Sequence, residues 1–303
     1  MVLRVATFAL SNSMTDAALR TQAEIATRQI QTASGKISAD YGGLGANSKK
    51  VIDLQVSVSR SSNYEQAASS ADDRVQVMYS ATGSIADLLS SFKTQLIAAT
   101  SAAATDSTSL TSAAQGYMDD IASLLNTQYG GRYMFAGSQT ETAPVDLSAY
   151  SNTTSATAAD TSYYTGDGQI ASAKVSDSQS ISYGVTADNS AFEQAMRALS
   201  MIANATTSPV DSTTIASALD LTTSALDGVT GVQTQLSLKA SQLESAVSTQ
   251  QDYQSFASTL SSNLTDVDVA VVTAQISTYQ TQLEASYSAL SKILSLKLSD
   301  YLK

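Results

Sequence analysis

The feature that most constrains this chain is a narrow apolar stripe near each of its ends. A single amphipathic helix cannot bury such a stripe, because most helix stability in proteins comes from packing. Near the N-terminus the apolar positions recur in steps of four and three residues, as on one face of an α-helix. They are Leu19, Ala23, Ala26, Ile30, Ala33 and Ile37. This helix therefore needs a partner.

The C-terminal stripe is longer and changes face part-way. Its first part has the same spacing and contains Leu260, Leu264, Val267, Val271 and Ala274. Its second part lies on a shifted face and contains Ile276, Tyr279, Leu283, Tyr287, Leu290, Leu294 and Tyr301. No Pro or Gly occurs in residues 232–303. The pattern predicts a helix of about 40 residues, roughly 60 Å long.

Two arrangements would cover these stripes. The two ends can pair with each other as an antiparallel coiled coil, or they can in addition pack against the ends of other subunits. Apolar content on two sides of residues 264–301 favours the second arrangement. The predicted assembly interface consists of Leu19, Ala23, Ala26, Ile30, Ile37, Leu264, Val267, Val271, Leu283, Tyr287, Leu290 and Leu294.

The middle of the chain contains further helical patterns and one region of a different kind. Two apolar series predict an antiparallel helical hairpin; they are Ile85, Leu89, Phe92, Leu96, Ala99 and then Leu110, Ala114, Tyr117, Ile121, Leu124. Another helix is expected over 190–205, and a long one from near Thr213. Between the predicted hairpin and the helix at 190–205, glycines flank an aromatic run at 129–137, and 179–185 alternates as a strand does.

The expected fold class is mainly α, a long antiparallel helical rod built from both chain ends with a small β-containing insertion in mid-chain. We expect a terminal helical domain at 1–38 and 262–303, a helical rod at 39–141 and 186–261, and a surface-exposed insertion at 142–185. Tyr163 and Tyr164 in the insertion are either its small core or a platform for a sugar.

Composition excludes most catalytic chemistry. The chain has no Cys and no His, so thiol catalysis, a Ser/His/Asp triad and a zinc site of the His/Cys type are unavailable. The glycine-rich run 42–50 lacks Walker spacing and is interpreted as a flexible connector. The neighbouring carboxylates Asp72 and Asp73 point about 100° apart on a helix, which suits no metal pair. No catalytic residue, metal or cofactor is expected.

Charge and hydropathy narrow the list of partners. The chain carries a net charge of −11 and has no basic stripe with interleaved aromatics, which argues against a nucleic-acid partner. It has no run of eighteen apolar residues, so no membrane span and no Sec signal is indicated. Basic side chains near the N-terminus can pair with acids of another subunit or keep that end soluble; they are Arg20, Arg28, Lys36, Lys49 and Lys50.

Four segments resemble the bacterial flagellin superfamily, and within it the hook-filament junction proteins. The most specific is the run GRYMFAGSQTETAP at 131–144. Supporting matches are TASGKI at 32–37, LEASY at 283–287 and LSL at 294–296. In that superfamily the terminal helices form the inner tube of a filament and mid-chain residues project outward.

The resemblance implies a non-enzymatic structural subunit that joins hook to filament through its terminal helices. It implies as partners other copies of the chain, a hook-side junction protein, flagellin and a cytoplasmic export chaperone. It also implies type III secretion of an unfolded chain to the extracellular flagellum. Alternatives are a flagellin that forms the filament itself, or a secreted coiled-coil adhesin or effector.

Overall fold

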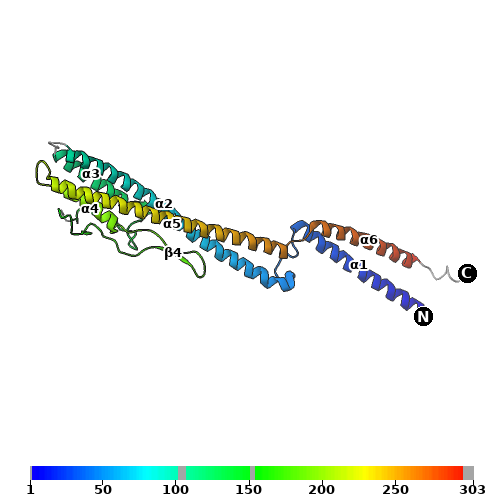
Figure 1. The fold of residues 1–303 in the computed structure, drawn as a ribbon. Coiled ribbons are helices and arrows are strands. Elements are labelled where there is room, and N and C mark those ends of the chain that lie inside the picture. The colour runs from blue at the N-terminus through cyan, green and yellow to red at the C-terminus, as the bar shows by residue number, and fades with distance from the viewer. Residues whose placement is uncertain (1, 102–106, 151–153, 296–303) are drawn as a thin grey trace. The chain divides into compact units, whose positions relative to one another are not determined.

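The protein is mainly α-helical, as expected. The computed structural model describes residues 2–101, 107–150 and 154–295. The helices are α1 (Val2–Ser34), the 3-10 helix η1 (Gly42–Asn47), α2 (Ser48–Ser101), α3 (Ser107–Leu125), α4 (Ser190–Ala203), α5 (Ser212–Thr265) and α6 (Val269–Ser295). The strands are β1 (Gln128–Tyr129), β2 (Arg132–Tyr133), β3 (Ser172–Lys174) and β4 (Ser180–Ser182), which form two antiparallel two-stranded sheets, β1-β2 and β3-β4 (Figure 1).

The chain divides into two compact units. Unit 1 contains the described residues up to Ser59 and from Gln254, and unit 2 contains Arg60–Tyr253. Unit 1 thus reaches further into the chain than the terminal domain expected at 1–38 and 262–303. Both α2 and α5 contribute residues to each unit.

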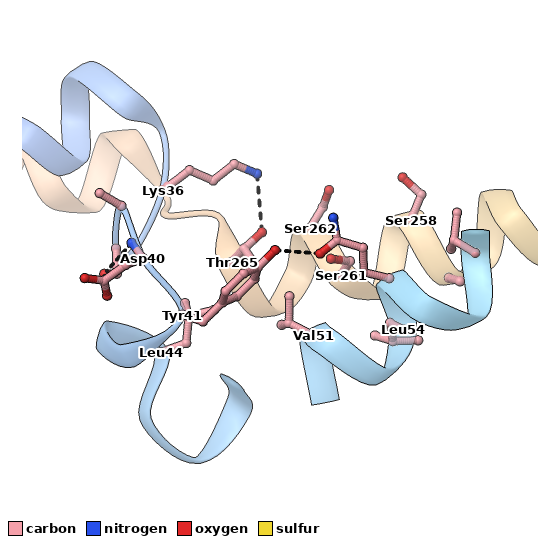
Figure 2. A pocket seen from close by; sticks show the side chains of 15 residues that line it. Lys36, Asp40, Tyr41, Leu44, Val51, Leu54, Ser258, Ser261, Ser262 and Thr265 are labelled. Carbon is pink, nitrogen blue, oxygen red and sulfur yellow. Dashed lines mark hydrogen bonds between the residues drawn. The ribbon is translucent and has the colours of Figure 1, made fainter. Parts of the chain in front are cut away.

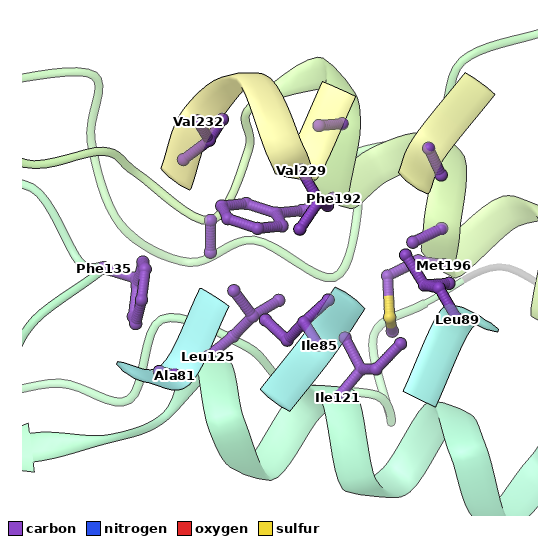
Figure 3. Close-up of a cluster of buried hydrophobic side chains, with 14 of the residues drawn as sticks. Ala81, Ile85, Leu89, Ile121, Leu125, Phe135, Phe192, Met196, Val229 and Val232 are labelled. Atoms are coloured by element: carbon purple, nitrogen blue, oxygen red, sulfur yellow. The ribbon is translucent and has the colours of Figure 1, made fainter. Parts of the chain in front are cut away.

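The core of unit 2 lies between long helices whose buried residues follow the period read from the sequence. Along α2 all five predicted residues are buried, from Ile85 to Ala99. On α3, Leu110, Ala114 and Ile121 are buried, and the Tyr117 ring lies 5.7 Å from that of Phe92. Figure 3 shows side chains from α2, α3, α4 and α5 meeting in this core. The predicted helical hairpin is therefore confirmed.

Helix α4 is the centre of this core, and it is buried on nearly every side. From Ala191 to Ile202 every residue except Gln194 is buried. Because Glu193, Arg197 and Ser200 are buried together with the apolar residues, α4 needs cover on its polar side as well. Helix α5 covers one side of α4 and approaches it closely at Gly228. A Cβ built at Gly228 would lie 2.8 Å from the Cβ of Ala191, so a larger residue would not fit.

The segment that resembles the hook-filament junction proteins is part of the core. Gly130 and Gly131 both have positive φ and form the turn between β1 and β2. The chain then becomes buried at Phe135, whose ring meets that of Phe192 edge to face at 5.9 Å. At Gly137, with φ +70, a Cβ would lie 2.2 Å from the carbonyl oxygen of Asp167. The motif is therefore a packing unit that needs its glycines.

Residues 142–185 differ from the exposed insertion that we expected. Many of their side chains face solvent, but a set of them is buried in the same core as α4: Val145, Tyr150, Tyr163, Ala173, Val175, Ile181 and Tyr183. Tyr163 is fully buried and donates its hydroxyl to the carbonyl of Ala187 at 2.9 Å. This confirms that Tyr163 belongs to a core. β4 shows the expected alternation, with Ile181 buried between two exposed serines.

A buried ion pair ties this insertion to α4. Glu193 and Arg197 are both buried and pair at 3.0 Å across one helical turn. The Arg197 guanidinium also donates to the carbonyl of Ala156 at 2.7 Å, and a Glu193 carboxylate oxygen accepts from the backbone N–H of Asp160 at 2.9 Å. The insertion thus supplies the polar partners that make these buried charges tolerable.

Gly228→Ala is expected to destabilise unit 2 by about 1–3 kcal/mol, because the added methyl group overpacks the contact with Ala191. Urea unfolding of the full chain measures this. Gly231→Ala is the matched control: it lies in the same helix, with nothing within 4 Å of the new Cβ. The control should gain about 0.5–1 kcal/mol from helix propensity. Equal effects of the two substitutions would contradict the close approach of α4.

Replacing residues 142–185 with a short Gly/Ser linker is expected to lower the thermal midpoint of unit 2 by well over a few degrees. The linker uncovers α4, and each large apolar side chain that leaves the core removes about 1.5–3 kcal/mol. It also leaves Glu193 and Arg197 without their backbone partners. Calorimetry would show the loss, and a midpoint within a few degrees of the parent would contradict a core role for residues 142–185.

Candidate assembly interface

In unit 1, helices α1 and α6 lie against each other (Figure 1). The inward side of α1 carries the buried residues Ala18, Ile25 and Gln31, with half-buried Met14, Thr21 and Arg28 between them. The inward side of α6 carries buried Val272 and half-buried Ile276, Tyr279, Leu283 and Leu290. The ends of the chain therefore pair with each other, as one of the two expected arrangements requires.

The predicted stripe of α1 is not the one that faces α6. Leu19 and Ile30 are 58% and 63% exposed, and Ala23 and Ala26 are exposed as well. At 3.6 residues per turn, this stripe is centred about 140° around the helix from the buried positions. Phe8, 70% exposed, falls on the same side. We call Phe8, Leu19, Ala23, Ala26 and Ile30 the open face of α1.

The predicted residues of the C-terminal region are divided between two sides of α6 and the chain before it. Leu283 and Leu290 lie on the side that faces α1, whereas Val271 and Tyr287 are 52% and 48% exposed. Leu264 belongs to α5, and Val267 lies between the helices; both are half-buried. The side chain of Leu294 lies outside the described residues. Ile37, also predicted, follows α1 and is exposed.

The single helix of about 40 residues expected from Leu260 onward is wrong, because α5 ends at Thr265 and α6 begins at Val269. At the break, the chain pairs with the residues that follow α1. The N–H of Ile37 donates to Thr265 at 2.7 Å, and the N–H of Val267 donates to Gly35 at 3.0 Å. Asp268 then caps α6 by accepting from the N–H groups of Ala270 and Val271.

Side chains reinforce this backbone pairing, which we call the clasp (residues 35–37 with 265–267). The Lys36 ammonium pairs with the Asp266 carboxylate. It also donates to the Thr265 hydroxyl at 3.3 Å (Figure 2). Hydrogen bonding from Lys36 and then from Thr265 lowers the pKa of Asp266. Gln31 donates to the carbonyl of Ile37 at 2.8 Å. Lys36 was one of the basic residues expected either to pair with an acid of another subunit or to keep the N-terminal end soluble. In the structure it pairs within the chain.

The clasp borders a hollow of about 550 Å³ in unit 1. Its apolar lining includes Leu44, Val51 and Leu54, and Tyr41 reaches into it, with its hydroxyl 2.5 Å from the side-chain oxygen of Gln55 (Figure 2). The glycine-rich run 42–50, expected to be a connector, forms η1 and the first turn of α2. The run therefore shapes the wall of this hollow.

Within the ranges that the structure describes, no group of three or more carboxylates could hold a metal ion. No described helix is both long and apolar enough to cross a membrane. Asp72 is half-buried, and burial followed by the charge of Glu244 raises its pKa. Asp73 accepts a hydrogen bond from the Tyr129 hydroxyl at 3.2 Å.

Two family models match the chain at both ends. The bacterial flagellin N-terminal helical region matches residues 5–140, and the bacterial flagellin C-terminal helical region matches residues 219–302. Together they cover more than two thirds of the chain, including α1, its open face and α6. The chain belongs to the bacterial flagellin family.

Individual members of the family are similar along most of the chain. The flagellar hook-associated protein 3 of Escherichia coli K12 is 27% identical over 299 residues, which cover 91% of this chain and 92% of that protein. A solved chain from Vibrio parahaemolyticus, assigned to the flagellar hook-associated proteins, shares the fold with a TM-score of 0.61 at 17% identity, over 75% of this chain and 99% of its own.

A second solved structure, the flagellar hook-associated protein-3 of Legionella pneumophila, has a TM-score of 0.57 at 14% identity. It covers 70% of this chain and 98% of its own. The flagellin family models leave residues 141–218 unmatched, and these residues contain the insertion and α4. The part of this flagellin-family chain outside both models thus includes the centre of the unit 2 core.

The carboxyl of Asp266 is expected to titrate below the ordinary value of about 3.9, because Lys36 and Thr265 favour its charged form. Its contribution to stability is therefore present above pH 3.9 and is lost as the pH falls through the lowered pKa. NMR titration of the carboxyl carbon measures this. Lys36→Met should return the value toward 3.9, whereas Lys49→Met, an exposed control, should not.

Proposed function

We propose that the protein is a structural subunit of the bacterial flagellum that joins hook to filament through its terminal helices. The observation that carries the proposal is the open face of α1, an apolar surface that α6 leaves uncovered in a chain of the flagellin family. The junction role is supported by the E. coli relative and by the two solved structures, all named as hook-associated proteins.

The two faces of α1 suit an element that packs within its chain and between chains. The inward side makes the pair with α6, and the open face remains for a neighbour. Covering Leu19 and Ile30 contributes about 1.5–3 kcal/mol each. The alanines between them carry small side chains, so the backbone of a neighbouring helix can approach closely. A ring or helical array of copies would present the same open face repeatedly.

The partners belong to the proposal as well. Besides other copies of the chain, they are a hook-side junction protein, flagellin and a cytoplasmic export chaperone. Secretion through the flagellar type III channel to the extracellular flagellum follows from membership of the flagellum, and a chain without Cys carries no thiols to cross-link during export. The relatives named above are hook-associated proteins, and no residue cluster in the described part of the chain suggests catalysis, so we propose that the protein is not an enzyme.

Deletion of the gene tests the junction role. The expected phenotype is intact hooks, no attached filaments, and flagellin secreted into the medium. If the cells instead lack flagellin subunits altogether while another junction protein is present, the chain forms the filament itself. Filaments of normal length and number would contradict both flagellar roles.

Ile30→Asp is expected to abolish incorporation while leaving the single chain folded, because a carboxylate on the open face has no partner once a neighbour covers it. Ser13→Asp is the matched control, since Ser13 is exposed on the same helix and lies about 120° around it from Leu19. Motility and immunodetection on purified hooks measure incorporation. Normal incorporation of Ile30→Asp would rule out the open face as the assembly surface.

Leu283→Asp and Leu290→Asp are expected to act differently. Both residues lie on the side of α6 that faces α1, so the carboxylate should disturb the pair within the chain as well as assembly. Circular dichroism of the isolated variants should show lost helix, unlike that of Ile30→Asp. Unchanged helix content in both leucine variants would contradict the pairing of α1 with α6.

A further inference from the structure

The tip of the β3-β4 hairpin lies at the end of unit 2 that contains Arg60 of α2 and Gln250 of α5. Val175, directly after β3, is 2% exposed, and the side-chain amide of Gln250 on α5 donates to its carbonyl at 2.9 Å. Two residues further on, Asp177 accepts from the Tyr64 hydroxyl of α2 at 2.7 Å and pairs with Arg60 at 3.3 Å. One short hairpin therefore contacts both long helices.

Gln250 also joins the two helices to each other. Its side-chain oxygen accepts from the hydroxyl of Ser61 at 2.8 Å, and the same hydroxyl lies 3.1 Å from the backbone carbonyl of Gln250. Ser61 is 3% exposed, so this is a buried polar layer between α2 and α5. The amide of Gln250 thus bonds at one end to the hairpin and at the other to α2.

The seam between the helices specifies their alignment poorly in this region. On α2 the buried residues after Ser61 are Ala68, Ala71 and Val75, and on α5 Ala240 and Leu243 precede Gln250. Small side chains interlock little, so a seam of alanines resists sliding less than one of leucine and isoleucine. A single buried polar layer is known to fix register in such helix pairs.

We propose that hairpin β3-β4 is a strap that holds α2 and α5 in one register at this end of unit 2, with Gln250 as the residue that ties the three elements together. The exposed contacts of the hairpin tip, from Asp177 to Arg60 and Tyr64, contribute less to holding the register. The side chains of Asp177 and Arg60 are 70% and 53% exposed, and exposed pairs contribute little. The buried contacts at Val175 and Ser61 carry the function, because their loss leaves buried polar groups unpaired.

Hydrogen exchange of the full-length chain, read by mass spectrometry, tests the strap. Gln250→Ala is expected to raise exchange about tenfold in residues 61–68 and 243–253, the effect of one lost hydrogen bond at the upper end of the usual range. Exchange in residues 85–96 and 192–202, the centre of the core, should stay within about twofold of the parent. Asp177→Asn should raise exchange in 61–68 by only about twofold.

Two controls separate the strap from general destabilisation. Gln242→Ala changes a more exposed glutamine of the same helix and should leave all segments as in the parent. Val175→Ala keeps Gln250 but loosens the hairpin, and should open the same two segments as Gln250→Ala. The proposal fails if Gln250→Ala leaves 61–68 protected, if it raises exchange equally across the core, or if Val175→Ala opens only the hairpin.

Discussion

Every part of this structure depends on how apolar faces of long helices are covered. In unit 2 the cover is complete: α2, α3 and α5 surround α4, and residues 142–185 close the remaining side with Tyr150 and Tyr163. In unit 1 the cover is partial, because α6 covers one face of α1, which is of mixed polarity, and leaves the apolar open face uncovered. The same polypeptide therefore contains helices that are covered entirely within the chain and one helix with an uncovered apolar face. The uncovered face is where a neighbouring subunit of a larger assembly can pack.

The helical part of the fold was predictable because it depends on local periodicity. Steps of three and four residues found α3, α4, and the buried side of α2 around Ile85 and Leu89. The same periodicity identified the face of α1 that contains Leu19 and Ile30. It did not identify the face that packs on α6, because Ala18 and Ile25 alternate there with Thr21 and Arg28. A face of mixed polarity is weak as a sequence signal, yet it is sufficient when its partner lies in the same chain.

Two features could not be predicted, because tertiary contacts determine them. The break after Thr265 has no Gly or Pro to announce it; it is stabilised by pairing with residues 35–37, distant in the sequence, and by the Asp268 cap. The role of residues 142–185 was misjudged on average polarity. Their buried residues are few and scattered, and they matter because α4 needs cover on the side that they occupy.

Where two helices pack through alanines, polar groups determine how the helices are aligned. A seam such as Ala68, Ala71 and Ala240 brings two backbones close but distinguishes poorly between neighbouring alignments. Beside this seam the structure places the hydrogen-bonded pair of Ser61 and Gln250, and in unit 1 the clasp at Lys36 and Asp266 fixes how the two chain ends meet. These contacts contribute less free energy than the apolar burial around them, but they are directional. Small apolar residues bring the helices together, and the polar layers select one alignment, so a chain poor in aromatics and rich in Ala and Ser can still present a defined open face.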